Sequence, residues 1–210
     1  PLTSMDVCAH EVGHAICTNT SDLVYARESG AMNEGFSDIW AAAVEQYVLD
    51  ELDNTLPYDV WGIGEQIDER DGGVGPGTAQ SRALRWMDDP KAAGDPDTYG
   101  GTNWTEPECG EPSLANDQCG VHTNSAVLNK WFYLLVTGSG QTLSLGSSKA
   151  TADDEVNDNG TAYNVGGIGF EDAEQIAFLT ETMLTPNAKF AEAREKSLIA
   201  AASLHGPCSP

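Results

Sequence analysis

The chain has 210 residues, 40% hydrophobic and 20% charged, which fits a folded globular protein of one domain or two small lobes and excludes a mini-protein or a disordered chain. Acidic residues outnumber basic residues by 33 to 10, and the formal net charge of −23 argues against nucleic acid or an anionic membrane surface as a partner. The apolar runs are too short for a membrane span, and Pro1 opens no signal peptide, so we expect a mature chain or a fragment.

Apolar residues at helical spacing predict a mainly α fold of five helices joined by long loops. The first two should pack face to face, with Thr3 or Ser4 as the N-cap of the first. The predicted helices span residues 3–17, 32–49, 123–136, 171–183 and 186–204, and a short helical piece is expected at 81–87. The segments between them are rich in Gly, Pro, Asp and Asn, and loops this long are typical of functional segments or of segments held by metal ions or disulfides.

An H-E-x-x-H pattern lies in the first predicted helix, at His10, Glu11 and His14. The i to i+4 spacing places both imidazoles on one helix face, where they can hold one zinc ion, and Glu11 beside them can act as a general base on a metal-bound water. A catalytic zinc needs a third protein ligand, and Glu34, near the start of the second helix, is a candidate. An acid in a first helical turn is also explained by the helix dipole.

The cysteines suggest one disulfide and leave three thiols open. Cys109 and Cys119 bracket a loop rich in turn residues, and a bond between them would stiffen it and indicate an oxidising, extracellular compartment. Cys8 and Cys17 lie roughly 13 Å apart along one helix and cannot pair with each other. Cys208 could bond to either of them, or all three could remain free thiols.

Three segments in this order, residues 6–14 (DVCAHEVGH), 30–38 (GAMNEGFSD) and 120–125 (GVHTNS), resemble motifs of the thermolysin-like secreted zinc metalloproteases. The resemblance continues through residues 83–90 and covers nearly the whole chain. It implies a mainly α, multi-helix C-terminal lobe with long ordered loops over residues 1–210. It also implies that the β-rich N-terminal lobe and the last helix of that family are absent from this chain.

The resemblance implies a zinc site and the residues that support it. The zinc ligands would be His10, His14 and Glu34, with Glu11 as the catalytic base. Asp38 and Asn33 would hold the ligand histidines in place.

The resemblance also implies residues that act on the substrate. Tyr25 and His122 would donate hydrogen bonds to the developing oxyanion, and Asp117 would orient His122. Arg85 would contact a backbone carbonyl of the substrate. An apolar pocket that selects large hydrophobic residues would be lined by Val7, Ile63, Ile67 and Leu84, side chains that simple core packing would also explain.

A calcium site is the part of the pattern from which this sequence departs. Asp6, Glu45 and Glu65 match acids of the family's paired calcium site, but Gly62 stands where another acid is expected and Asp59 aligns uncertainly. We therefore expect one calcium ion rather than two. Bound calcium is one explanation for the acidity of the chain, and a solvated surface suited to solubility or high salt is the other.

These observations favour a secreted zinc endopeptidase, and the resemblance implies that it cleaves on the amino side of large hydrophobic residues. Its expected partners are a peptide or protein substrate and the missing N-terminal lobe or a propeptide, with no nucleic acid and no membrane, and the complete protein is expected to be a monomer. One alternative is a non-catalytic, metal-stabilised lobe that binds a partner lobe or propeptide. Another is a zinc aminopeptidase, although the chain lacks an evident acidic anchor for a free substrate amine.

Overall fold

The computed structural model describes residues 3–52, 59–67, 83–140 and 156–207, and it confirms a mainly helical fold. The helices are α1 (Met5–Asn19), α2 (Arg27–Tyr47), α3 (Asp117–Asn124), α4 (Ala126–Thr137), α5 (Phe170–Met183) and α6 (Phe190–His205). A π-helix (Val48–Leu52) continues α2, and 3-10 turns span Pro90–Ala92 and Leu114–Asn116. Two short strands, β1 (Gly62–Ile63) and β2 (Arg85–Trp86), pair antiparallel, with Gly62 opposite Trp86 and Ile63 opposite Arg85.

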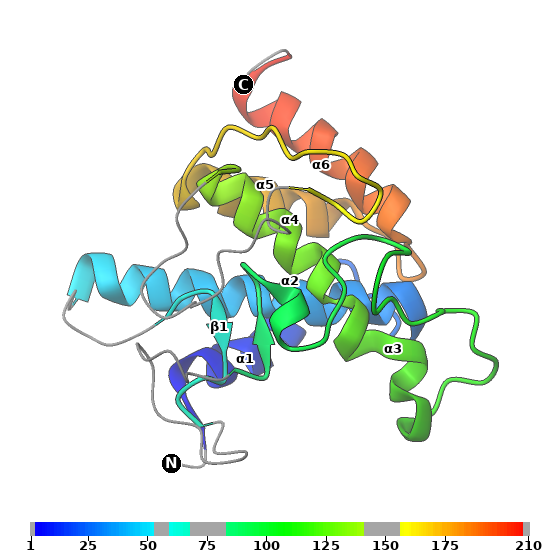
Figure 1. Ribbon diagram of the computed structural model, residues 1–210. Coiled ribbons are helices and arrows are strands. Elements are labelled where there is room, and N and C mark those ends of the chain that lie inside the picture. The colour runs from blue at the N-terminus through cyan, green and yellow to red at the C-terminus, as the bar shows by residue number, and fades with distance from the viewer. Residues whose placement is uncertain (1–2, 53–58, 68–82, 141–155, 208–210) are drawn as a thin grey trace.

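Helix α2 runs through the centre of the molecule, as Figure 1 shows. In that view α1 lies below it, α4, α5 and α6 lie above it, and the two termini lie at opposite ends. Most residues of α2 are buried, including polar ones, because the helix is covered on several sides. The core gathers apolar side chains mainly from α2, α4 and α5, among them Met32, Phe36, Ile39, Phe132 and Ala177.

The first two helices cross closely, as the sequence predicts. Gly13 lies between the two histidines of α1 and faces Ser37 of α2. A Cβ atom at Gly13 would lie 2.6 Å from the Ser37 Cα, a distance that real Cβ atoms do not show. Because residue 13 has no side chain, both His10 and His14 reach the surface of α2.

The helix predicted at residues 81–87 is wrong within the described residues 83–87. Ala83, Trp86 and Met87 have helical spacing, but their backbone pairs with another segment: Leu84 N donates to Ile63 O at 2.7 Å, and Met87 N donates to Trp61 O at 2.8 Å. Tertiary pairing therefore overrides the local pattern in this segment.

Several helix boundaries also differ from the predicted ones. Helix α2 begins at Arg27, five residues earlier than expected, and α6 begins at Phe190 rather than at residue 186. The helix predicted at 123–136 is divided at Ser125 into α3 and α4. Ser4 occupies the N-cap position of α1, but its hydroxyl donates to the Asp6 carboxylate instead of accepting from a helix N–H. In the described part of the chain, no helix is both long and apolar enough to cross a membrane.

Candidate metal centre

The crossing of α1 and α2 brings together three side chains with metal-binding atoms. One ligand atom each from His10, His14 and Glu34 all lie within 4.8 Å of one another. His10 Nε2 lies 3.4 Å from Glu34 Oε2, and His14 Nε2 lies 3.4 Å from Glu34 Oε1. His10 and Glu34 are buried, and His14 is half-buried. The three donors therefore converge on one point at the edge of the core.

Both imidazoles are held by their other ring nitrogen. His10 Nδ1 lies 2.7 Å from Asp38 Oδ1, and His14 Nδ1 lies 2.7 Å from Asn33 Oδ1. These contacts favour a proton on each Nδ1 and leave each Nε2 lone pair directed toward Glu34. Asp38 and Asn33 thus each lie within hydrogen-bonding distance of Nδ1 of one of these histidines.

A buried ion pair lies behind the histidines. Arg85 Nε and Nη2 donate to Asp38 Oδ2 and Oδ1, each at 2.7 Å, and Asn129 Nδ2 donates to Asp38 Oδ2 at 2.8 Å. Burial would raise the pKa of Asp38, but the Arg85 charge and the hydrogen bond from His10 outweigh burial and hold the pKa well below its usual range. The same pairing raises the pKa of Arg85. Arg85 and Asp38 therefore remain charged inside the protein.

The donor set suits a zinc ion in its chemistry and spacing. Two atoms that bind one tetrahedral zinc at 2.0–2.1 Å are about 3.3 Å apart, and each histidine nitrogen lies 3.4 Å from one of the two Glu34 oxygens. Within the described ranges, Glu34 Oε2 is buried and accepts no hydrogen bond. Burial would lower the pKa of His10, but Asp38 and Glu34 raise it to about 9. A proton thus occupies, in the absence of a metal, the position that a cation would take.

Tyr25 and His122 lie on the open side of the three donors. The Tyr25 hydroxyl donates to Glu34 Oε1 and lies 3.2 Å from His122 Nε2. Burial and the Glu34 carboxylate raise the pKa of Tyr25, which keeps its hydroxyl protonated and able to donate. Asp117 accepts the His122 backbone N–H at 3.0 Å and contacts His122 Nδ1. The structure thus groups these three residues as the sequence predicts.

The other residues that the resemblance assigns to the substrate or to catalysis differ in their exposure. Glu11 is exposed on α1. Ile63 belongs to the buried core, and Val7 and Ile67 are half-buried. Leu84 is 42% exposed and lies against Gly64, where an added Cβ atom would meet its side chain at 2.8 Å. A cavity of about 550 Å³ beside the centre is lined by His14, Tyr25 and Asn33, together with residues of the turn before α2, and it contains none of these four apolar side chains.

The predicted calcium ligands form a buried acidic cluster. Asp6 and Glu45 are fully buried, and Asp59 and Glu65 nearly so. Burial and repulsion from neighbouring acids raise the pKa of Glu45 to about 9 and that of Glu65 to about 8. The carboxylate oxygens of these two glutamates accept no hydrogen bond from the described residues. This environment is unfavourable for free carboxylates.

Two polar residues that support the centre were not predicted. Ser37 Oγ lies 3.2 Å from His14 Nδ1, and Asn129 holds Asp38. Asn129 and Lys130 are polar residues within an otherwise apolar helical segment, and this break in the pattern could have marked Asn129 as a residue with a buried polar partner. Asp95 was also missed: burial raises its pKa to about 6, and its charge interacts with those of Arg85, Asp117 and His122.

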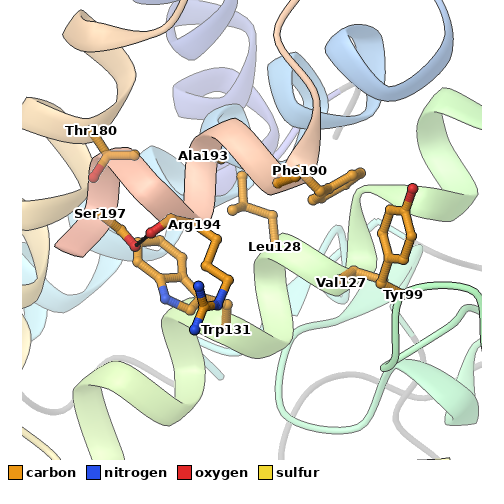
Figure 2. A pocket seen from close by; sticks show the side chains of 10 residues that line it. Tyr99, Val127, Leu128, Trp131, Thr180, Phe190, Ala193, Arg194 and Ser197 are labelled. Carbon is orange, nitrogen blue, oxygen red and sulfur yellow. Dashed lines mark hydrogen bonds between the residues drawn. The ribbon is translucent and has the colours of Figure 1, made fainter. Parts of the chain in front are cut away.

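A separate apolar cavity of about 460 Å³ lies against α4 and α6 (Figure 2). Tyr99, Trp131 and Phe190 line it with aromatic rings, and Arg194 extends beside Trp131. It shares no lining residue with the three metal-binding side chains. The cavity is therefore separate from the candidate centre.

The predicted cysteine pair is joined in the structure. Cys109 and Cys119 lie 2.05 Å apart at their sulfur atoms, with their Cα atoms 5.6 Å apart. Among the described residues Cys8 is exposed and Cys17 is buried, and neither forms a disulfide. Cys208 lies outside the described residues, so a bond from it to Cys8 or Cys17 and three free thiols both stay open predictions.

Comparison with known proteins gives a consistent family. Residues 21–210 match the family model described as thermolysin metallopeptidase, alpha-helical domain. The chain is 37% identical over 205 residues to a bacillolysin of Bacillus cereus, covering 96% of this chain and 28% of that protein. It is 36% identical over 208 residues to a thermolysin of Alicyclobacillus acidocaldarius, covering 98% of this chain and 30% of that protein. The chain thus spans less than a third of the length of these two relatives.

A solved structure supports the fold. The precursor of protealysin, a metalloproteinase from Serratia proteamaculans, superimposes with a TM-score of 0.54 over 94% of this chain and 51% of that one. At 24% sequence identity, this likeness concerns the fold alone.

Proposed function

The chain belongs to the thermolysin metallopeptidase family, as its α-helical domain, and from this premise we propose that it carries the zinc site and catalytic groups of a secreted endopeptidase. The observation that carries the proposal is the convergence of His10, His14 and Glu34 beside the Tyr25–His122 pair. The expected compartment is extracellular, in keeping with the Cys109–Cys119 disulfide.

His10, His14 and Glu34 would hold the zinc ion, with one position left open. When bound, zinc supplies a Lewis acid that polarises a carbonyl and makes water more acidic. Glu11 follows His10 on the exposed side of α1, where it would accept a proton from the attacking water and pass it to the leaving amine. Asp38 and Asn33 would keep the two imidazoles oriented throughout.

Tyr25 and His122 would stabilise the negative charge that develops on the carbonyl oxygen. Their polar atoms lie 3.2 Å apart, so one oxyanion could accept a hydrogen bond from each. Asp117 would accept a hydrogen bond from Nδ1–H of the doubly protonated His122 ring and direct its Nε2–H to the substrate. Arg85, fixed by Asp38, would extend its guanidinium toward a backbone carbonyl of the substrate.

The substrate is a peptide or protein, cleaved on the amino side of a large hydrophobic residue that Val7, Ile63, Ile67 and Leu84 would select. One calcium ion would occupy the acidic cluster, where Glu45 and Glu65 otherwise repel each other. We further propose that residues 1–210 act as a C-terminal lobe beside a β-rich lobe or propeptide, and that the complete protein is a monomer.

Hydrolysis of a quenched peptide with a central leucine or phenylalanine tests the proposal. The assay compares the unmodified sequence with Glu11→Gln, which keeps the shape of the side chain but removes the base. It uses the 210-residue chain and any longer protein that contains it. The expected result is cleavage before the hydrophobic residue and a loss of about a thousandfold or more in Glu11→Gln, the upper end of what one removed acid–base group costs. If the unmodified 210-residue chain and the longer protein both bind zinc but neither cleaves the peptide, the result would instead support the non-catalytic alternative.

A further inference from the structure

The backbone just before His122 adopts a rare conformation. Asp117, Gln118, Cys119 and Gly120 have φ angles of 53°, 51°, 68° and 83° in succession. Left-handed angles are unfavourable for residues other than glycine and normally occur singly. This turn brings Asp117 back over His122, so that both its carboxylate oxygens face the backbone and ring nitrogens of that residue. Since the turn is locally unfavourable, the surrounding structure must hold it.

The disulfide is attached to the middle of this turn. Cys119 is fully buried and is bonded to Cys109 in the loop before it. Gly120 lies against the same loop, where an added Cβ would be 2.6 Å from the Thr105 Cβ. Asn124 exchanges two hydrogen bonds with the Thr105 backbone, at 2.9 and 2.7 Å. The loop at residues 105–110 therefore acts as a support for the turn.

Arg27 connects this loop to the segment that carries Tyr25. Its Nη1 donates to Pro107 O at 2.7 Å and to Glu108 Oε2 at 3.1 Å, and its Nη2 donates to Gly110 O. These acceptors flank Cys109 in the sequence. Arg27 follows Tyr25 by two residues and itself has a φ of 58° at the first position of α2. A continuous series of bonds thus runs from the Tyr25 segment through the loop to the His122 turn.

We propose that the Arg27 guanidinium and the Cys109–Cys119 disulfide form a bracket that fixes Tyr25 relative to the Asp117–His122 pair. The bracket consists of Arg27, Cys109 and Cys119, which are positioning residues rather than catalytic ones. Tyr25 and His122 are 97 positions apart, so local structure cannot set the distance between them. The inference rests on the proposed function, because it concerns the two groups assigned to the oxyanion.

Kinetics of two variants test the bracket. Cys109→Ser removes the disulfide at its exposed end, and Arg27→Met removes the guanidinium that binds the loop at residues 107–110. Displacing a catalytic group by about 1 Å costs about a hundredfold in rate, so each variant should lower kcat by about tenfold to a hundredfold, with the zinc content unchanged and KM within about twofold. The matched controls are Cys8→Ser, at an exposed cysteine that forms no disulfide with a described residue, and Arg194→Met, at an exposed arginine outside the centre. Unchanged kcat in both bracket variants would overturn the proposal.

A spectroscopic measurement tests the bracket without hydrolysis. Because Asp117 contacts Nδ1, the neutral His122 ring should carry its proton on Nδ1, whereas free histidine prefers Nε2. Long-range 1H–15N correlation spectra, assigned with His122→Gln, should show the Nδ1–H form in the unmodified chain and in Cys8→Ser, and a shift toward Nε2–H in Cys109→Ser. If Cys109→Ser keeps the Nδ1–H form, the bracket is wrong. If neither the 210-residue chain nor a longer protein that contains it cleaves the peptide, the proposed function fails, and the tautomer of His122 still tests the bracket.

Discussion

Asp38→Asn should weaken both the fold and the zinc site, because one buried carboxylate serves both. Asp38 accepts four hydrogen bonds: one from His10, two from Arg85 and one from Asn129. Asparagine keeps one acceptor oxygen and turns an NH₂ group toward these donors. It also leaves the Arg85 charge buried, with Glu34 Oε2, 3.8 Å from Arg85 Nη2, and the more distant Asp95 as the remaining acids near it among the described residues. Removing one partner of a buried pair costs about 3–5 kcal/mol, and removing a partner of a metal-ligating histidine costs about 10–100-fold in metal affinity.

Urea unfolding of the metal-free protein measures the first effect, and zinc competition with a chromophoric chelator measures the second. Asp172→Asn is the matched control, since Asp172 lies in α5 and its only described charge contact is with His205 at 3.9 Å. Combining Asp38→Asn with Arg85→Met removes both charges, so the double variant should lose less free energy of unfolding than the sum of the two single losses. The reasoning is refuted if Asp38→Asn loses under about 1 kcal/mol and binds zinc within about threefold of the unmodified protein.

Three further predictions follow from individual groups. Asp38 and Glu34 raise the pKa of His10 to about 9 in the metal-free protein, so zinc binding at pH 7.5 should release about one proton. Calorimetry in buffers of different ionisation enthalpy measures this release. A result of no released proton would contradict the prediction. Glu45 and Glu65 have pKa values raised to about 9 and about 8, so without calcium the free energy of unfolding should fall as pH rises from 5 to 9. Calcium should then raise the melting temperature more at pH 8.5 than at pH 5.5, and Glu45→Gln should remove most of that difference. Gly120→Ala places a side chain at a φ of 83° against Thr105 and should cost about 2 kcal/mol in chemical unfolding, whereas a loss below about 0.5 kcal/mol would show that the turn tolerates it.

The sequence predicted the parts of the centre that depend on local spacing. His10 and His14 reach one point because they are four residues apart on a helix, and the sequence predicts that helix at residues 3–17, close to its observed bounds. Glu34 could be placed only as a candidate from its position in the chain, and the resemblance to a known family singled it out.

The start of α2 could not be predicted, because tertiary contacts stabilise it. Ala26 is its N-cap, with no side-chain hydrogen bond, and Arg27 has a left-handed φ of 58°. The first turn instead gains a buried Glu28 that accepts the backbone N–H of Phe190 at 3.0 Å. Arg27 carries no helix-start signal, and the acid Glu28 in the first turn is too common a signal to fix the start by itself.

The hydrogen bonds around Arg85 could be predicted from the sequence only in part. Its members, Asp38, Arg85 and Asn129, come from three segments that only the fold brings together. The resemblance gave Asp38 and Arg85 separate roles but did not connect them. The same holds for the left-handed turn at Asp117, whose geometry depends on a disulfide and on packing against residue 105.

The most direct test of the account is the zinc content per chain, measured by elemental analysis after dialysis against metal-free buffer. The account predicts one zinc in the unmodified protein, none in His10→Ala or His14→Ala, and one in an inactive Glu11→Gln. This outcome would separate the residues that hold the metal from the residue that uses it. Absence of zinc from the unmodified protein, or its retention in both histidine variants, would contradict a metal centre built from His10, His14 and Glu34.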